Sequence, residues 1–313
     1  MNDLNKRAFD ACGELPNCAD ELGIARHSIH GATVWDFGVD SPGNLNAGVR
    51  LAEICTARLA TIQIEPPVPH WSGPSVSVRT DQPIAACMAS QYAGWQIATD
   101  DYFAMGSGSM RAANGTEEIF DALGYRESPS RVVGVLESSK LPTASCIQAI
   151  ADSCKVSAAE ITLAIAPTAS QAGNIQVVAR SVETALHKMH ELGFDLNRVE
   201  SGYGIAPLPP VAKDDLAGIG RTNDAILFGG NVTIWVRGDD ESLEEISPQL
   251  PSNASRDFGK PFREIFADYD HDFYKIDKHL FSPAQIMLCN LDTGRTFRSG
   301  KIHADLIQAS FLQ

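Results

Sequence analysis

The sequence predicts an α/β fold, α+β in character, in which mixed strands and helices form two lobes. Three observations lead to this prediction. Short runs of β-branched and other apolar residues, typical of strands, recur along the chain, and helical patterns lie between several of them. One helical pattern lies between two apolar runs, as in a parallel strand–helix–strand unit. Two proline-rich stretches separate the middle of the chain from its two ends.

Six segments have the composition of strands. A helix is expected over 143–154, between the runs at 132–136 and 161–166, and these three segments make up the predicted strand–helix–strand unit. The predicted strands are 33–37, 75–79, 132–136, 161–166, 232–236 and 286–289.

The proline-rich stretches at 65–74 and 206–211 are expected to be rigid connectors, because proline is excluded from the interior of helices and ladders. They divide the chain into a discontinuous first lobe, residues 1–74 and 206–313, and a second lobe, residues 75–205. A cleft between two lobes is a common place for a ligand, so we expect the substrate cleft there.

The composition restricts the class of partner. The chain has 313 residues, of which 44% are hydrophobic and 20% charged, as in globular proteins. Its 39 acidic and 25 basic residues give a net charge of −14. This charge disfavours nucleic acid and anionic membranes as partners, because phosphate binding needs a basic face. A small molecule, mildly favoured if it carries positive charge, is the expected partner.

The sequence also predicts a cytoplasmic protein. No apolar segment lies in the first twenty residues, and no stretch approaches the roughly 18 apolar residues that span a bilayer. The seven cysteines are an odd number without a Cys-x-x-Cys pair, which is typical of buried thiols in a reducing compartment.

The most informative segment is 170–193, which is predicted to be one helix. Gly193 stands where a left-handed C-terminal cap belongs. Apolar residues recur with the spacing of one helical face, at Ile175, Val178, Val182, Leu186 and Met189.

A polar stripe flanks this apolar face, formed by Gln176, Arg180, Glu183 and His187. Arg180 and Glu183 are neighbours, because they are three residues apart. They form either a solvated ion pair of about 0.2–0.5 kcal/mol or a catalytic pair. In the second interpretation, Arg180 keeps the Glu183 carboxylate ionised, ready to take a proton from water.

Two loops carry further candidate residues. The glycine loop 106–111, with Ser107, lacks both the third glycine of a dinucleotide fingerprint and the Gly-Lys-Ser/Thr of a P-loop, but exposed amides there could bind an anion. Thr168 and Ser170 follow a strand and precede a helix, so they are expected to cap the helix, contact a ligand, or do both.

The polar segment 220–225 has two interpretations. A helix start capped by Thr222 or Asn223 explains the spacing. Alternatively, Arg221 binds a carboxylate or phosphate group, with Asn223 beside it. The pairs His27/His30 and His187/His190 have no further ligands in sequence, so no metal site is predicted.

These segments together resemble the methenyltetrahydromethanopterin cyclohydrolase family. One of the blocks that carry the resemblance is Ala-Arg-Ser-Val-Glu-Thr at 179–184. The resemblance covers the chain nearly from end to end, through the blocks 30–34, 41–43, 93–96, 101–108, 136–139, 166–170, 179–184, 220–227, 272–277 and 300–302.

The resemblance implies a cytoplasmic homotrimer of two-lobed subunits, without a metal or a prosthetic group, whose substrate is a tetrahydromethanopterin derivative. It implies hydrolysis of the methenyl bridge to the N5-formyl product. This reaction belongs to one-carbon metabolism, which includes formaldehyde oxidation in methylotrophs. It assigns catalysis to Arg180 and Glu183. Substrate contacts are expected from Ser107, Thr168, Ser170, Arg221 and Asn223.

Three other functions stay open on the sequence. One is a nicotinamide-dependent pterin oxidoreductase of the same pathway, using the loop 106–111. A second is a pterin-binding protein without catalytic activity. A third is a zinc hydrolase using His187 and His190.

Overall fold

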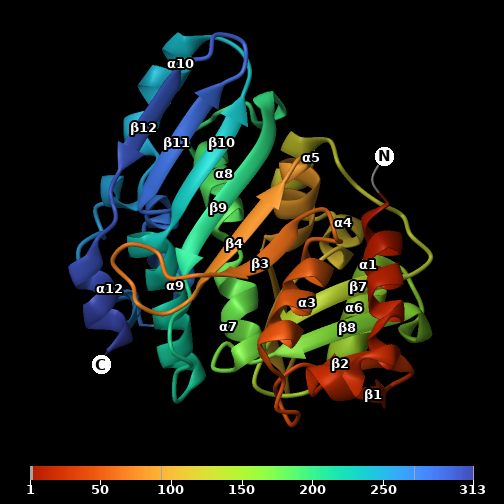
Figure 1. The fold of residues 1–313 in the computed structure, drawn as a ribbon. Helices are drawn as coiled ribbons and strands as arrows, with labels where there is room; N and C mark the ends of the chain where they lie inside the picture. Colours follow the sequence, from red (N-terminus) through yellow and green to blue (C-terminus); the bar gives the residue numbers. More distant parts are fainter. Residues whose placement is uncertain (1–2, 93, 271, 313) are drawn as a thin grey trace. The chain divides into compact units, whose positions relative to one another are not determined.

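The computed structural model describes residues 3–92, 94–270 and 272–312, so Ala93 of the block 93–96 lies outside the described residues. The chain forms two compact units. The first unit comprises Met1–Ala60 and Ala85–Gln176, and the second comprises Thr61–Ile84 and Val177–Gln313. Each unit contains one six-stranded mixed sheet with helices packed on it (Figure 1).

The sheet of the first unit has parallel strands at its centre and antiparallel strands at its edges. Strand β2 pairs in parallel with β8, and β8 with β7, whereas the pairs β1–β2, β7–β6 and β6–β5 are antiparallel. In sheet order, the strands are β1 (Ala25–Ile29), β2 (Ala32–Asp36), β8 (Ile161–Ala166), β7 (Val132–Glu137), β6 (Phe103–Ser107) and β5 (Trp95–Ala98).

Helices cover both faces of this sheet. Helix α6 (Ala144–Cys154) connects the parallel strands β7 and β8, which confirms the predicted strand–helix–strand unit. Its residues Cys146, Ile147 and Ile150 belong to the apolar core on one face. Helices α1 (Leu4–Gly13) and α3 (Leu45–Cys55) contact β7 on the other face (Figure 1).

The shorter helices of the first unit lie in its connections. An unusual π-helix, Ile84–Gln91, occupies the point where the chain enters this unit, and almost all of it is buried. The others are η1 (Leu15–Asn17), α2 (Ala19–Leu22), α4 (Met110–Asn114), α5 (Ile119–Leu123) and η3 (Ala158–Glu160).

The sheet of the second unit is mainly antiparallel, and only β10 and β11 pair in parallel. Figure 1 shows its strands side by side. In sheet order they are β12 (Thr296–Gly300), β11 (Gln285–Asn290), β10 (Asn231–Val236), β9 (Val199–Pro207), β4 (Ser75–Thr80) and β3 (Thr61–Glu65).

Helices α8 (Ser181–Glu191) and α9 (Asp215–Gly229) contact the sheet of the second unit, and α11 (Phe262–Asp268) and α12 (Ala304–Phe311) contact α9. Helix α7 (Gln171–Val178) carries the chain from the first unit into the second. In the described residues, every helix is too short or too polar to traverse a bilayer. The remaining helices are α10 (Asp240–Ile246), η4 (Leu196–Arg198), η5 (Ser247–Gln249), η6 (Ser252–Ala254), η7 (Phe273–Lys275) and η8 (Lys278–Leu280).

All six predicted strands are confirmed as β2, β4, β7, β8, β10 and β11. The strands that the sequence pattern did not indicate are mostly edge strands or contain glycine, such as β6 and β9. Strand β9 also ends on Pro207, inside a predicted connector. Proline is tolerated there because it lies at the end of the strand.

The observed units differ from the predicted lobes 1–74 with 206–313 and 75–205. Residues before 60 belong with the middle of the chain because β2 pairs with β8. Strand β9 belongs with the C-terminal part because it pairs with β10 and β4. The stretch 65–74 connects the paired strands β3 and β4, so it lies within one unit. The cleft expected between the lobes stays a prediction.

Glycines on β9 determine how closely α8 approaches the second sheet. A Cβ atom at Gly202 would lie 2.6 Å from Cγ1 of Val182, and one at Gly204 would lie 2.4 Å from Oγ of Ser181. Carbon atoms do not approach so closely, so only glycine fits between the strand and the first turn of α8 at these two places.

We therefore expect Gly202→Ala to destabilise the protein by about 1–3 kcal/mol, as overpacking of a core does. Val182 cannot easily turn aside, because β-branched side chains have one preferred rotamer in helices. Urea unfolding measures the effect. Gly13→Ala is the control, since a Cβ there meets nothing within 4 Å. Equal midpoints for the two variants would contradict the proposed close packing.

The buried carboxylate of Asp224 connects three helices of the second unit. Its Oδ1 accepts a hydrogen bond of 2.8 Å from the N–H of Phe262 on α11. Its Oδ2 accepts one of 2.6 Å from the hydroxyl of Ser310 on α12. Burial raises the pKa of Asp224 from 3.8 to about 7, although both hydrogen bonds oppose the rise. The carboxyl group that holds α11 and α12 to α9 is buried, so its ionisation lowers the stability of the folded state.

This cost predicts a pH-dependent stability. Between pH 4 and 7 the folded state holds the Asp224 proton and the unfolded chain does not, so the free energy of unfolding falls as the pH rises. Asp224→Asn keeps an acceptor and cannot ionise. We expect this variant to exceed the wild type in stability above pH 7, by up to about 4 kcal/mol, and to lose the advantage near pH 4.

Denaturant unfolding at pH 4.5 and pH 8 checks this expectation. The exposed Asp152→Asn is the control and should follow the wild-type pH profile. A parallel profile for Asp224→Asn and the wild type would show that Asp224 does not titrate in this range.

Candidate functional site

The segment 170–193 forms two helices, α7 and α8, so the prediction of one continuous helix is wrong. The chain turns at Ala179 and Arg180, where Arg180 has φ −87° and ψ 9°. Its N–H donates to the carbonyl of Val177 at 3.1 Å. This bond spans three residues, as in a 3-10 turn, where an α-helix would span four, and α8 starts at the next residue. The continuous polar stripe that included Gln176 therefore does not exist.

Gln176 belongs to a buried cluster in the first unit. Its Nε2 lies 3.6 Å from the sulfur of Cys55, and that sulfur lies 3.3 Å from Oγ of Ser107. Gln176, Cys55 and Ser107 are all buried. Gln176 thus contributes to the interior of the first unit and shares no helical stripe with Glu183.

Arg180 and Glu183 occupy the start of α8, at the N-cap and the third helical position. Both are buried, with 5% and 4% of their surface exposed, so the interpretation as a solvated surface pair does not hold. The N-terminal end of a helix carries partial positive charge, which favours an ionised carboxylate in the first turn. A buried arginine and a buried glutamate in one helical turn can hold and polarise a small polar molecule such as water.

The end of α8 agrees with the sequence prediction. Gly193 has φ 79°, and its N–H donates to the carbonyl of His190 at 2.9 Å. The N–H of Phe194 donates to the carbonyl of Met189 at 3.0 Å, which completes a Schellman cap. The left-handed cap at Gly193 is confirmed.

The later turns of α8 carry further titratable groups. Burial lowers the pKa of His187 to about 4, so its imidazole is neutral at physiological pH, and Nε2 lies 3.6 Å from Oε1 of Glu191. Lys188 is buried, and its Nζ donates to the carbonyl of His279 at 2.6 Å. Burial lowers its pKa to about 8. Among the described residues, no three His, Cys, Asp or Glu side chains gather as metal ligands, around His187 or elsewhere.

Thr168 and Ser170 lie just beyond the carboxyl end of β8, beside the ends of its parallel neighbours β2 and β7. Ser170 Oγ accepts a hydrogen bond of 3.0 Å from the N–H of Gly173, so its predicted cap of the following helix is confirmed. A Cβ at Gly38, just after β2, would lie 2.8 Å from Ser170 Oγ. The two loops therefore pack together at the edge where ligands of parallel sheets bind.

The carboxylate of Asp36 at the end of β2 holds the neighbouring loop in place. It accepts hydrogen bonds of 2.6 to 2.9 Å from four consecutive N–H groups, residues 38–41. Burial raises its pKa, but the four bonds together outweigh burial, and the resulting pKa lies below 3.8. Asp36 remains ionised and keeps this edge rigid.

The glycine loop 106–111 is buried and its groups are used in packing. The N–H of Gly108 donates to the carbonyl of Ser90 at 2.8 Å. Ser107 Oγ donates to the carbonyl of Val135 at 3.3 Å. Arg111, fully buried, forms two hydrogen bonds with the carboxylate of Glu117, at 2.9 and 2.6 Å. The possibility of exposed amides is therefore wrong for Gly108, and the loop has the role of an internal support.

Arg221 and Asn223 lie inside α9, which starts earlier than expected. Asp214 caps this helix, accepting from the N–H of Ala217 at 2.8 Å. The predicted cap by Thr222 or Asn223 is wrong. Thr222 Oγ1 and Asn223 Nδ2 donate to the carbonyls of Gly218 and Ile219 of the same helix, at 2.9 and 2.8 Å.

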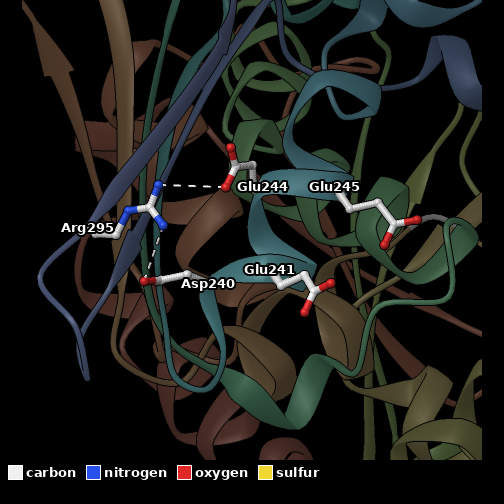
Figure 2. A pocket seen from close by; sticks show the side chains of 5 residues that line it. All are labelled: Asp240, Glu241, Glu244, Glu245 and Arg295. Atoms are coloured by element: carbon white, nitrogen blue, oxygen red, sulfur yellow. Dashed lines mark ion pairs between the residues drawn. The ribbon is translucent and has the colours of Figure 1, made fainter.

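Two of the cavities that the described residues form lie within the second unit. One, of about 540 Å³, is lined by Arg295 and four acidic residues of or near α10. Figure 2 shows that Asp240 and Glu244 pair with Arg295, whereas Glu241 and Glu245 point away from it. The other cavity, of about 520 Å³, is lined by Arg221 and Asp224 of α9, by neighbouring residues of α11 and α12, and by the segment before α9.

Lys188, Asp224 and Arg263 were not predicted as functional residues from the sequence, although Asp224 and Arg263 line the second cavity. Asp224 lay within the polar segment 220–225 and could have been noted as a carboxylate among apolar helical neighbours. No sequence pattern distinguishes Lys188 and Arg263, because their surroundings come from distant parts of the chain.

Comparison with known proteins identifies the family. A family model described as "Cyclohydrolase (MCH)" matches residues 3–311. Methenyltetrahydromethanopterin cyclohydrolase of Rhodopirellula baltica is 45% identical, over 99% of this chain and 95% of the relative. The enzyme of that name from Methylobacillus flagellatus is also 45% identical, over 90% and 86%.

The similarity extends to an archaeal relative. Methenyltetrahydromethanopterin cyclohydrolase of Methanococcoides burtonii is 38% identical, over 99% of this chain and 98% of its own length. These matches do not favour an oxidoreductase or a pterin-binding protein without catalytic activity. The chain therefore belongs to the cyclohydrolase (MCH) family.

Proposed function

We propose that this protein hydrolyses the methenyl bridge of a tetrahydromethanopterin derivative to the N5-formyl product. The observation that carries the proposal is the buried pair Arg180 and Glu183 in the first turn of α8, in a chain of the cyclohydrolase family. A buried carboxylate three residues after a buried arginine suits a reaction whose substrate is a cation and whose second reactant is water.

The proposed substrate carries one carbon bound to two nitrogens in a cationic, amidinium-like bridge. This carbon is already electrophilic, so the enzyme has to activate and aim a water molecule. Glu183 takes one proton as the water oxygen bonds to the carbon. The bond from that carbon to one nitrogen then breaks as the remaining O–H group loses its proton and becomes the formyl carbonyl. The departing nitrogen receives a proton, and the formyl group stays on the other nitrogen. One proton is released overall.

Arg180 is proposed to keep Glu183 ionised and oriented. Its position at the N-cap lies one helical turn before the carboxylate, and the helix N-terminus adds positive potential. The Glu183 carboxylate also stabilises the cationic substrate. General-base catalysis contributes roughly 10²–10⁴ in rate, and holding water against the carbon adds a proximity effect.

Substrate contacts are proposed for the other predicted residues according to their surroundings. Thr168 and Ser170 lie at the carboxyl edge of parallel strands, which supports a ligand contact. Ser107 is buried against Cys55 and Val135, so its proposed influence on the substrate passes through the loop it supports. Arg221 lines a cavity and suits an anionic tail. The proposed contact of Asn223 is a separate one, because Asn223 is not among the residues that line this cavity.

The reaction is proposed to need no cofactor, and the cytoplasmic location and homotrimer implied by the family resemblance stay predictions. A spectrophotometric assay of the methenyl chromophore without added cofactor tests the reaction directly. Catalytic loss of the chromophore supports hydrolysis. A requirement for a nicotinamide with absorbance change at 340 nm, or loss stoichiometric with protein, contradicts it.

Glu183→Gln keeps the shape of the side chain and removes its basicity. We expect kcat to fall by about 10²–10⁴, because the general base acts in the transition state, and KM to rise, because the charge that stabilises the cationic substrate is lost. The exposed Glu245→Gln on α10 is the control and should retain wild-type turnover. Near wild-type turnover of Glu183→Gln would refute this role.

Arg221→Ala tests the proposed contact with the tail of the substrate. Loss of a charged hydrogen bond costs about 1.5–3 kcal/mol, so we expect KM to rise roughly tenfold or more while kcat stays within about twofold. The exposed Arg298→Ala on β12 is the matched control. An unchanged KM for Arg221→Ala counts against the tail contact, and a fall in kcat alone does so as well.

A further inference from the structure

The cavity beside α9 is positively charged in a strongly acidic protein. Three of its nine described lining residues are cationic, namely Lys213, Arg221 and Arg263. In the whole chain only 25 of 313 residues are lysine or arginine, and the net charge is −14. Such a local excess of positive charge attracts an anion against the average field of the protein.

The packing of α9 and α11 brings two of these cations to one cavity. A Cβ at Gly220 would lie 3.1 Å from the Cβ of Arg263, so glycine at this position allows close approach of the start of α11. Arg221 follows directly in the chain, and its Nη1 donates to the carbonyl of Pro210 at 3.2 Å. The guanidinium is thereby directed toward the segment that carries Lys213.

Two of these cations, Lys213 and Arg263, are little neutralised by protein carboxylates. Within the described part of the chain, no carboxylate lies within 4 Å of Arg263 in an ion pair, and the Lys213 ammonium lies 3.9 Å from Asp214. Asp224 lines the cavity, but its two oxygens accept hydrogen bonds from Phe262 and Ser310. Burial also favours the neutral form of Asp224, with a pKa of about 7.

The acidic cavity of the same unit shows the opposite arrangement. There Arg295 has two carboxylate partners, Asp240 and Glu244, at 3.6 and 3.7 Å (Figure 2). Guanidinium groups bind phosphate and carboxylate through paired hydrogen bonds. A cavity with two arginines, one lysine and one carboxylate whose oxygens already accept hydrogen bonds from Phe262 and Ser310 has the chemistry of a site for such an anion.

We propose that the cavity lined by Lys213, Arg221 and Arg263 binds the phosphate or carboxylate group of a small molecule. Anion binding is independent of the proposed hydrolysis. Only the assignment of the anion to the tail of the substrate rests on the proposed function. Arg263 and Lys213 are then binding residues that act together with Arg221.

Isothermal titration calorimetry with inorganic phosphate, at constant ionic strength and pH 7.5, tests the proposal. We expect saturable binding to the wild type, at one phosphate per chain. Arg263→Gln and Arg221→Gln should each weaken it by about tenfold or more, as expected for lost charge-assisted hydrogen bonds. Arg295→Gln, the same change in the acidic cavity, is the control and should bind phosphate as the wild type does.

The outcomes are distinct from those of the activity assay, because binding is measured without the pterin. Phosphate that competes with the pterin substrate identifies the anion as a group of that substrate. Phosphate that binds without changing the KM of the pterin identifies a separate anionic ligand. Competition with the pterin and binding without competition both support the site. Absence of saturable binding, or equal affinity in Arg263→Gln and the wild type, overturns it.

Discussion

The close approach of α8 to β9 sets the position of the groups on which the proposed chemistry depends. Gly202 and Gly204 leave room for Val182 and Ser181, the first residues of the helix. Arg180 and Glu183 lie immediately before and after these two residues, so their backbone is fixed by the same contact. Catalytic groups work best on rigid elements whose own packing leaves no freedom, and a helix held against a strand provides this.

The turn at Ala179 and Arg180 is equally important. In one unbroken helix, Arg180 would lie in the interior, where the ends of the helix dipole have little influence. The break makes Arg180 the N-cap and places Glu183 in the first turn, near the N–H groups that have no acceptor within the helix. Two helices in place of one thus change the electrostatic environment of the carboxylate without any change in its neighbours along the sequence.

The parts of the fold with strong local patterns could be predicted from the sequence. The buried strands β7 and β8 consist of apolar residues on both faces, and the helix between them has a clear periodicity. The lobe boundaries could not be predicted, because the pairing of β2 with β8 and of β9 with β10 joins segments far apart in the chain. The proline-rich stretches could be recognised in the sequence, but prolines indicate only local rigidity and do not show which strands pair.

The same distinction applies to the candidate site. Helical spacing placed Arg180 and Glu183 on a polar stripe and the family resemblance assigned catalysis to them, but their burial comes from the tertiary structure. The break in the helix could not be predicted, because the sequence around it contains no proline or glycine. Val178, Ala179 and Ser181 are all compatible with a helix. The first residues after the break, Ser181 and Val182, pack against Gly204 and Gly202, about twenty residues later in the chain. A single sequence shows both partners of this contact, and nothing in it shows that they meet.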